Sequence, residues 1–244
     1  YQFKLSPKIN CMKTINQVLI LAGGKGTRMR EMTSDLPKPM VKIGERPVLD
    51  HLINIFNHFG SFEFVVCTGY LSEIIEEYFK DYDNVKIVNT GYEANTGARV
   101  LAAKEYIQDE FIVTYGDGLA NVKIDELLNF HNRHNKIGTI TVTNPISRFG
   151  LVKFDKRKKV LDFIEKPTLE GFINMGFMVF KKDFLNFLDS SSVLESTPLE
   201  NLASQNELFA FEHTGFFQPM DTYREYIELN KLWNEAECPW MNFE

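Results

Sequence analysis

The stretch QVLILAGGKGTRM, residues 17–29, decides how the rest of the chain is interpreted. Its first part, residues 17–22, is an almost continuous apolar run, which is typical of a strand buried on both faces of a sheet. The glycines and the threonine that follow can form a loop whose backbone N–H groups converge on phosphate oxygens. Lys25 and Arg28 supply positive charge for such a ligand. The alternative is a plain glycine turn with solvated charges.

Two well-known glycine loops do not match this stretch. The Rossmann pattern G-x-G-x-x-G requires glycine at position 29, which is Met29. The P-loop requires a lysine after its last glycine, but Gly26 is followed by Thr27. A nicotinamide-dependent oxidoreductase and a P-loop nucleotidase are therefore both disfavoured.

Downstream of this loop, short strand-like runs alternate with longer helical ones. We expect strands at 64–67, 85–89, 111–115 and 139–143, and helices at 48–59, 72–82, 98–107 and 124–134. Strands that alternate with helices of about ten residues indicate βαβ units and a mostly parallel sheet with helices on both faces.

The second half of the chain follows a different rhythm. Residues 150–154 and 160–164 predict an antiparallel pair of strands, and 172–180 a further strand. Helices are expected at 182–188, 198–206 and 222–235. The fold class is therefore α/β, with a mixed, mostly parallel sheet.

Composition places the chain among ordinary globular proteins. Of its 244 residues, 44% are hydrophobic and 25% are charged, which is too apolar for intrinsic disorder. No apolar run approaches the roughly 18–20 residues that cross a bilayer, and residues 1–11 lack the apolar core of a signal peptide. We therefore expect a cytoplasmic protein without a membrane partner.

Charge and cysteine content exclude further classes. The chain has 27 basic and 33 acidic residues, and its net charge of −6 argues against nucleic acid as a partner. Cys11, Cys67 and Cys238 are too few and too scattered for a disulfide framework or a zinc site. Residues 1–11 show no periodicity, so we interpret them as a loose arm or a non-native extension, and residues 12–244 as a single domain.

Lys38 is the next candidate, because Pro37 and Pro39 flank it. Both prolines restrict the local backbone, so the ammonium group extends from a stiff loop. A turn lysine without a function is the alternative, but its position ten residues after Arg28 favours a joint role.

Two aspartates are candidate metal ligands. Asp117 lies between Gly116 and Gly118 at the carboxyl end of a predicted strand, where open α/β sheets bind their ligands. A carboxylate there suits Mg²⁺, which takes one or two protein carboxylates together with substrate phosphates. Asp221 is the second candidate, and its alternative role is to cap the following helix. The sequence of Thr222 and Glu225 fits a capping box, which would leave the Asp221 carboxylate free.

The last motif is Glu165-Lys166-Pro167, at the end of the predicted antiparallel pair. A lysine held by a following proline can serve a second phosphate. A solvated pair of charges at the end of a strand is the alternative. No Ser/His/Asp or Cys/His arrangement stands out in the chain.

Five motifs in this order resemble those of the sugar-phosphate nucleotidylyltransferase family. They lie at residues 22–29, 36–39, 116–118, 165–167 and 218–222. The stretch GFFQPMDT at 215–222 is similar in particular to the glucose-1-phosphate cytidylyltransferase branch of that family. The resemblance covers residues 12–244.

The resemblance implies a Rossmann-like nucleotide-diphospho-sugar transferase fold. It also implies transfer of CMP from CTP to a phosphorylated sugar or another small organic phosphate, with release of pyrophosphate. The product would be a CDP-activated building block for surface polysaccharide. Such a transfer depends on positioning and charge stabilisation, so the missing nucleophilic side chain is expected.

The resemblance also assigns roles to individual residues. Catalytic roles fall to Arg28, Lys38, Asp117 and Lys166. Nucleotide binding falls to Leu21, Ala22, Gly23, Gly24, Lys25, Gly26, Thr27, Arg28, Lys38, Thr96, Gly97, Arg99 and Gly116. Residues 96–99 would recognise cytosine through backbone groups, with the Arg99 side chain as an additional candidate. Acceptor binding falls to Gly150, Glu165, Lys166 and Asn174. Asp117 and Asp221 would hold Mg²⁺.

The chain departs from the family at one informative place. The relatives carry a long insertion after the segment matching residues 78–82, where only Asp83 and Asn84 stand here. That insertion contributes to oligomer contacts near the active site, so a homo-oligomer and a glucosyl acceptor both stay open. A phosphorylated polyol or another organic phosphate is the alternative acceptor. Met175 and Phe172 also replace family residues near the expected acceptor pocket.

A function of a different class stays in competition. The same fold can serve as a catalytically idle nucleotide-binding or regulatory domain. The set of charged residues that the family uses for catalysis is complete here, which favours an enzyme. Its members are Arg28, Lys38, Asp117, Lys166 and Asp221.

Overall fold

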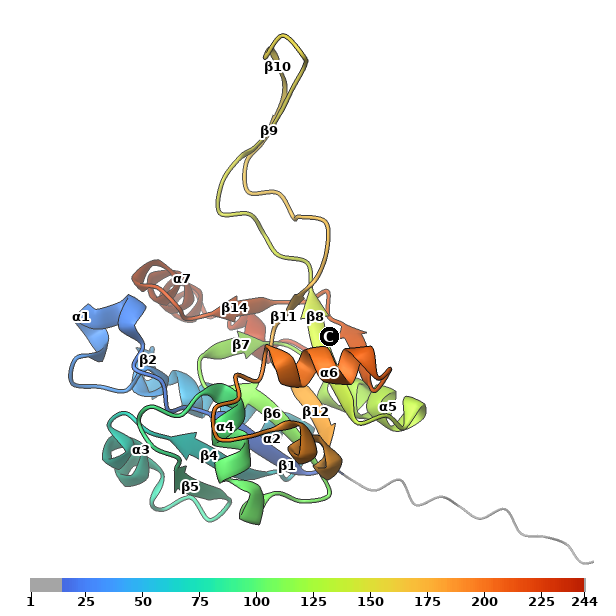
Figure 1. The fold of residues 1–244 in the computed structure, drawn as a ribbon. Coiled ribbons are helices and arrows are strands. Elements are labelled where there is room, and N and C mark those ends of the chain that lie inside the picture. The colour runs from blue at the N-terminus through green and yellow to red at the C-terminus, as the bar shows by residue number, and fades with distance from the viewer. Residues whose placement is uncertain (1–14, 244) are drawn as a thin grey trace, which may run out of the picture.

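Strand β1 (Gln17–Leu21) is buried along its whole length and lies inside the sheet, as its apolar run predicts. It pairs in parallel with β4 (Glu63–Thr68) on one side and with β6 (Glu110–Tyr115) on the other. The computed structural model describes residues 15–243 (Figure 1). The interpretation of residues 1–11 as a loose arm therefore lies outside the described residues.

Within residues 15–243, eight strands form the main sheet. Six of them follow the order β8, β12, β6, β1, β4, β5, and β11 and β13 also pair with β8. Only β11 and β12 run antiparallel to their neighbours, so the sheet is mixed and mostly parallel as predicted. The remaining strands are β5 (Val85–Asn89), β8 (Gly138–Thr143), β11 (Ile173–Asn174), β12 (Met178–Lys181) and β13 (Leu208–Glu212).

Helices cover both faces of this sheet. Successive side chains of β1 point to opposite faces, so each face has an apolar core that the helices cover. Val18 and Ile20 enter one apolar core, whereas Leu19 and Leu21 enter the other. The first core takes side chains from α2 (Val48–Phe59), α3 (Ser72–Phe79), α5 (Ile124–His134) and α7 (Tyr223–Asn234). The second takes them from α4 (Thr96–Ala102) and α6 (Thr197–Ser204).

Short elements connect these layers. Helix α1 spans Arg30–Thr33, and 3-10 turns span Thr27–Met29, Lys38–Met40, Lys104–Tyr106, Lys182–Phe187 and Pro239–Met241. Two small antiparallel pairs join β2 (Lys42–Ile43) to β3 (Arg46–Pro47) and β7 (Gly118–Ala120) to β14 (Phe217–Pro219).

The structure corrects three expectations. The strand expected at 172–180 is broken into β11 and β12, because Gly176 and Phe177 have φ angles of +86° and +51°. The helix expected at 182–188 is a 3-10 helix, and the one expected at 98–107 ends as α4 with a separate 3-10 turn after it. Strand β13 was not predicted, because it is an edge strand without a continuous buried run.

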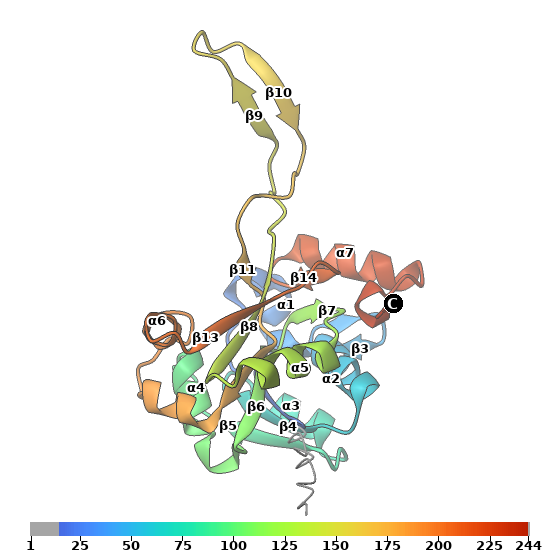
Figure 2. The ribbon, with the colours of Figure 1, turned by 90° about the vertical axis from the view of Figure 1, so that its right-hand side faces the viewer.

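The predicted antiparallel pair forms, but it projects far from the body (Figures 1 and 2). It consists of β9 (Leu151–Phe154) and β10 (Val160–Ile164). At its base, Ser147 donates a backbone hydrogen bond to Pro167 and Leu169 donates one to Pro145, each at 2.9 Å. We call residues 145–172 the arm.

Two further expectations can be compared with the structure. Among residues 15–243, Cys67 and Cys238 are both free thiols, and Cys11 lies outside that range. No helix in the described part of the chain combines the length and the apolar character needed to span a membrane.

Helix α7 offers a test of the core. Leu229→Ala removes a side chain without exposed surface from the first core, and we expect a loss of about 2–5 kcal/mol in the free energy of unfolding. Ile227→Ala, on the exposed side of the same helix, should change it by less than about 0.5 kcal/mol. Urea unfolding followed by circular dichroism measures both. Equal losses would show that α7 is not packed as described.

Candidate active site

The site lies where the carboxyl ends of β1 and β6 meet. Gly116 donates a backbone hydrogen bond of 3.0 Å to Leu21 across the two strand ends. Beside this junction lies a pocket of about 410 Å³. Of the predicted nucleotide-binding residues, its wall contains Leu21, Ala22, Gly23, Gly24, Gly26, Thr27, Arg28, Lys38, Thr96, Arg99 and Gly116.

Two predicted nucleotide-binding residues lie outside this wall. The ammonium group of Lys25 lies 4.2 Å from the ring centre of Tyr92, where it makes a cation–π contact. Gly97 is buried in α4 against Ser192, and a Cβ atom there would lie only 2.8 Å from the Ser192 side chain. The packing of α4 therefore explains the glycine at 97.

The glycine loop leaves backbone donors available. Within the described chain, the N–H groups of residues 23–26 donate no hydrogen bond to protein. The Gly26 carbonyl accepts from Met29 N–H and the Thr33 hydroxyl, which ties the loop to the following helix. Gly26 has a φ of +63°, and a Cβ atom there would lie 2.9 Å from Cβ of Lys38, so only glycine fits. Such a loop can bind an anion through its N–H groups.

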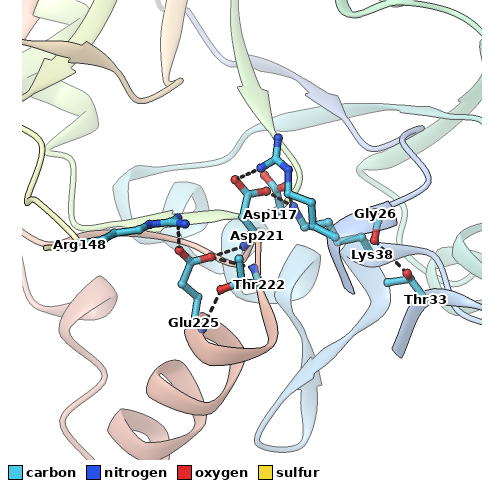
Figure 3. Close-up of polar contacts among 9 residues, drawn as sticks. Gly26, Thr33, Lys38, Asp117, Arg148, Asp221, Thr222 and Glu225 are labelled. Atoms are coloured by element: carbon cyan, nitrogen blue, oxygen red, sulfur yellow. Dashed lines mark hydrogen bonds and ion pairs between the residues drawn. The ribbon is translucent and has the colours of Figure 1, made fainter. Parts of the chain in front are cut away.

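Lys38 connects the two aspartates. Its ammonium group donates to Asp117 and, at 2.6 Å, to Asp221 (Figure 3). Arg28 donates to the other Asp221 oxygen at 2.8 Å. The structure thus brings together four predicted residues from segments far apart in the chain.

These contacts shift the protonation of the cluster. Burial by itself lowers the pKa of Lys38, but the charges and hydrogen bonds of Asp117 and Asp221 outweigh it, so the pKa is raised. Burial by itself raises the pKa of Asp221, but Lys38 and Arg28 outweigh it and hold the pKa below its ordinary value. Lys38 and Asp221 are therefore charged at neutral pH.

The start of α7 decides between the two interpretations of Asp221. Thr222 caps the helix by accepting from Glu225 N–H, and the Glu225 carboxylate accepts from Thr222 N–H at 2.8 Å. The predicted capping box is therefore confirmed. The same carboxylate also accepts from Asp221 N–H at 2.8 Å, so the Asp221 side chain is free to point towards Lys38.

The donor set around Lys38 fits Mg²⁺. The carboxylates of Asp117 and Asp221 both contact the ammonium group of Lys38, and both keep some exposure to solvent. Among residues 15–243 there is no group of three or more histidine, cysteine, aspartate or glutamate side chains that would hold a metal without help. Two carboxylates suffice for Mg²⁺ when substrate phosphates supply further oxygens.

The Arg99 side chain has a different task from the one expected. It is buried, and its guanidinium donates to the carbonyls of Thr68, Gly91, Gly23 and Tyr92 and to the Thr90 hydroxyl, at 2.7–3.3 Å. Burial lowers its pKa. Because the backbone and the Thr90 hydroxyl occupy these donors, Arg99 holds the glycine loop and the 90–92 segment in place, and its guanidinium is not free to read a base.

Sequence reasoning missed several residues of the pocket wall, among them Glu195 and Tyr115. Glu195 accepts from the Tyr115 hydroxyl at 2.5 Å and from the Thr96 hydroxyl at 2.7 Å. Burial and the Glu195 carboxylate raise the pKa of Tyr115, so the phenol stays protonated. Glu195 lies in an irregular segment before α6 that matches no motif, so only the tertiary structure reveals it.

The predicted acceptor residues are not gathered in the pocket wall. Gly150, Glu165 and Lys166 all lie on the arm, and the wall contains no arm residue. Asn174, at the end of β11, accepts a hydrogen bond from Gly176 N–H and also contacts the Tyr115 hydroxyl. The structure therefore places Lys166, which was expected to share a catalytic role with Arg28, Lys38 and Asp117, outside the pocket wall that contains those three residues.

Comparisons with known proteins agree with this geometry. A family model described as nucleotidyl transferase matches residues 17–211. The glucose-1-phosphate cytidylyltransferase of Salmonella typhimurium is 38% identical, over 93% of this chain and all of that protein. The probable glucose-1-phosphate cytidylyltransferase of Bacillus subtilis is 37% identical, over 92% of this chain and 98% of that protein.

Solved structures share the fold. HddC from Yersinia pseudotuberculosis in complex with GMP-PN is 24% identical, with a TM-score of 0.69 over 90% of this chain and all of that one. A UDP-glucose pyrophosphorylase in complex with UDP-glucose is 17% identical, with a TM-score of 0.72 over 91% of this chain and all of that one. The family model, which covers most of the chain, and the two relatives at 37% and 38% identity show that the chain belongs to the nucleotidyl transferase family.

Proposed function

We propose that the protein transfers CMP from CTP to a phosphorylated sugar or another small organic phosphate and releases pyrophosphate. The observation that carries this proposal is the cluster of Arg28, Lys38, Asp117 and Asp221 beside a loop with free N–H groups. The product would be a CDP-activated building block for surface polysaccharide. We further propose that residues 12–244 act as one domain in the cytoplasm.

The glycine loop would bind the triphosphate. Its N–H groups at residues 23–26 have no acceptor among residues 15–243, and a phosphate chain supplies many acceptor oxygens. Arg99 supports this role by fixing the Gly23 carbonyl from the protein side. The loop is thereby shaped before the nucleotide arrives, which lowers the entropy cost of binding.

Arg28 and Lys38 would stabilise the charge that develops during transfer. An attack on the α-phosphate by an acceptor phosphate oxygen puts negative charge on the α-phosphate and on the departing pyrophosphate. Both side chains remain cationic in the cluster, and Arg28 is largely exposed at the pocket. Positioning and charge stabilisation of this kind supply most of the rate enhancement in such reactions.

Asp117 and Asp221 would hold Mg²⁺. The ion, when bound, supplies positive charge to phosphate oxygens. The two aspartates would hold it from just after β6 and from just before α7. Lys38 keeps the two carboxylates together, and with Arg28 it holds the pKa of Asp221 below its ordinary value.

The preference for CTP rests on the relatives named as cytidylyltransferases and on the wall at residues 94–96. Backbone groups of Thr96 and Gly97 stay our candidates for contact with the base, with Arg99 supporting the neighbouring segment. The acceptor end would use Gly150, Glu165, Lys166 and Asn174. Glucose 1-phosphate is the acceptor in the relatives' names, and a phosphorylated polyol is the alternative.

An idle nucleotide-binding domain is the competing function. Such a domain would need neither the paired carboxylates nor the buried Lys38. Removing these charged groups from water costs free energy. The intact cluster therefore favours an enzyme.

The nucleotide can be tested directly. With Mg²⁺ and a panel of phosphorylated sugars and polyols, we expect pyrophosphate release with CTP and at least about tenfold less with ATP, GTP, UTP or dTTP, a factor that corresponds to one added hydrogen bond. A coupled phosphate assay measures the release. Turnover with another nucleotide and none with CTP would overturn the base assignment, whereas binding of CTP without turnover for any acceptor would favour the idle domain.

The aspartates provide a second test. Asp117→Asn and Asp221→Asn should each lower kcat by about a hundredfold or more, because each removes a charge that acts on the transferring phosphate. Asp125→Asn, in the first turn of α5, is the matched control and should leave kcat unchanged. Circular dichroism should show the same fold for all three variants. Unchanged kcat in Asp117→Asn would contradict the metal role.

A further inference from the structure

Lys25 carries a positive charge that no acidic side chain of the described residues neutralises. Its ammonium group lies 4.2 Å from the ring centre of Tyr92, and among residues 15–243 it forms no ion pair and donates no hydrogen bond. An aromatic ring attracts a cation through its quadrupole and leaves the charge in place. In contrast to Lys38, which is paired with two carboxylates, Lys25 therefore keeps its three N–H donors for another partner.

The contact between Lys25 and Tyr92 lies at the rim of the pocket. Gly24 and Gly26, on either side of Lys25, belong to the pocket wall, and so do residues 94–96, which follow Tyr92 closely in the chain. The side chains of Lys25 and Tyr92 are not part of that wall. An anion bound by the N–H groups of residues 23–26 would lie next to the loop from which Lys25 extends.

The backbone of Tyr92 is held from the interior of the protein. Nη2 of Arg99 donates to the Gly23 carbonyl at 3.0 Å and to the Tyr92 carbonyl at 3.3 Å. Nη1 of the same guanidinium donates to the Gly91 carbonyl at 2.8 Å. Because Arg99 is buried, this bridge fixes the spacing between the glycine loop and the segment that carries the ring.

The ring of Tyr92 is also supported by a second aromatic side chain. The ring centres of Tyr70 and Tyr92 are 6.0 Å apart, with their planes at 58°. The Tyr70 hydroxyl donates to the Ser34 carbonyl at 2.5 Å, and its N–H donates to the Gly23 carbonyl at 3.3 Å. Tyr92 is 40% exposed, yet both its backbone and its ring have partners that also hold the glycine loop.

This arrangement prepares Lys25 for an anion. A lysine side chain loses much rotamer entropy when a ligand fixes it, and a contact made in advance lowers that cost. The pocket wall also contains the carboxylates of Asp117, Asp221 and Glu195, which attract a free ammonium group. The ring of Tyr92 competes with these carboxylates for Lys25 and leaves its charge available.

We propose that Tyr92 is a positioning residue whose ring holds the Lys25 ammonium group at the rim of the pocket, where it binds the triphosphate of the incoming nucleotide. Lys25 contacts the phosphates, and Tyr92 acts only through Lys25. Arg99 and Tyr70 hold the ring in place. The identity of the anion as a nucleoside triphosphate rests on the proposed function, whereas the positioning of the cation does not.

A tyrosine at the rim of a nucleotide pocket has a second conceivable role, which is to stack on the base. The two roles differ in the part of the ligand that they recognise. Inorganic tripolyphosphate carries the charges of the triphosphate but no base. A ring that acts through Lys25 therefore affects the binding of CTP and of tripolyphosphate alike, whereas a ring that stacks affects CTP alone.

Isothermal titration calorimetry with CTP and with inorganic tripolyphosphate, at one fixed Mg²⁺ concentration, tests the proposal. We expect Tyr92→Leu to raise the Kd of both ligands about two- to fivefold, which is the effect of losing one exposed cation–π contact. Tyr92→Phe keeps a ring and should bind both ligands as the wild type does. Lys25→Met should raise both Kd values about tenfold or more, and Lys25→Met/Tyr92→Leu should match Lys25→Met alone.

The matched control is Tyr106→Leu, because Lys86 lies 4.6 Å from the ring centre of Tyr106 at a place outside the pocket wall. This variant should change neither Kd, and all variants should keep the wild-type melting temperature. Wild-type Kd values in Tyr92→Leu, or a double variant that binds more weakly than Lys25→Met alone, would overturn the proposal. A loss with CTP but not with tripolyphosphate would also overturn it and would assign the ring to the base.

Failure of the proposed function would be seen in a different measurement. A wild type that binds both ligands but releases no pyrophosphate with any acceptor would contradict the transferase, and the Kd series would still decide the role of Tyr92. A wild type that binds neither ligand would overturn the positioning of Lys25 as well.

Discussion

The ion pairs of Lys38 with Asp117 and Asp221 are the interaction on which the site depends. They join the loop after β1, the end of β6 and the turn before α7, which are brought together only when the sheet and its covering helices are complete. Without Lys38, two partly buried carboxylates would face each other and repel. The lysine therefore stabilises the apposition of these segments.

The same arrangement explains how a chain with a net charge of −6 can serve polyanionic substrates. The local field in a pocket matters more than the total charge, because low-dielectric walls focus it. Here Arg28, Lys38 and the N–H groups of the glycine loop face one space. Arg99 contributes from behind by donating to the carbonyls of Gly91 and Gly23.

Glu225 links this site to the arm. Its carboxylate accepts from the backbone of Asp221 and Thr222 and forms an ion pair with Arg148 at the arm's base. The base of the arm and the turn that positions Asp221 therefore share one carboxylate. The residues proposed for nucleotide binding lie at the end of the sheet, whereas Glu165 and Lys166, which are proposed for the acceptor, lie on a projecting ribbon.

The sequence alone determined the α/β fold, because the buried run of β1 and the periodicity of the helices depend on local spacing. It also determined that Arg28, Lys38, Asp117 and Asp221 are candidates for one site, since strand ends and rigid loops are visible in the residue order. Only the tertiary structure decided that Arg99 is occupied by backbone carbonyls, that Glu195 lines the pocket, and that Lys166 lies outside it. These outcomes depend on which distant segments pack together and on the direction in which the arm leaves the sheet, and neither is encoded in local spacing.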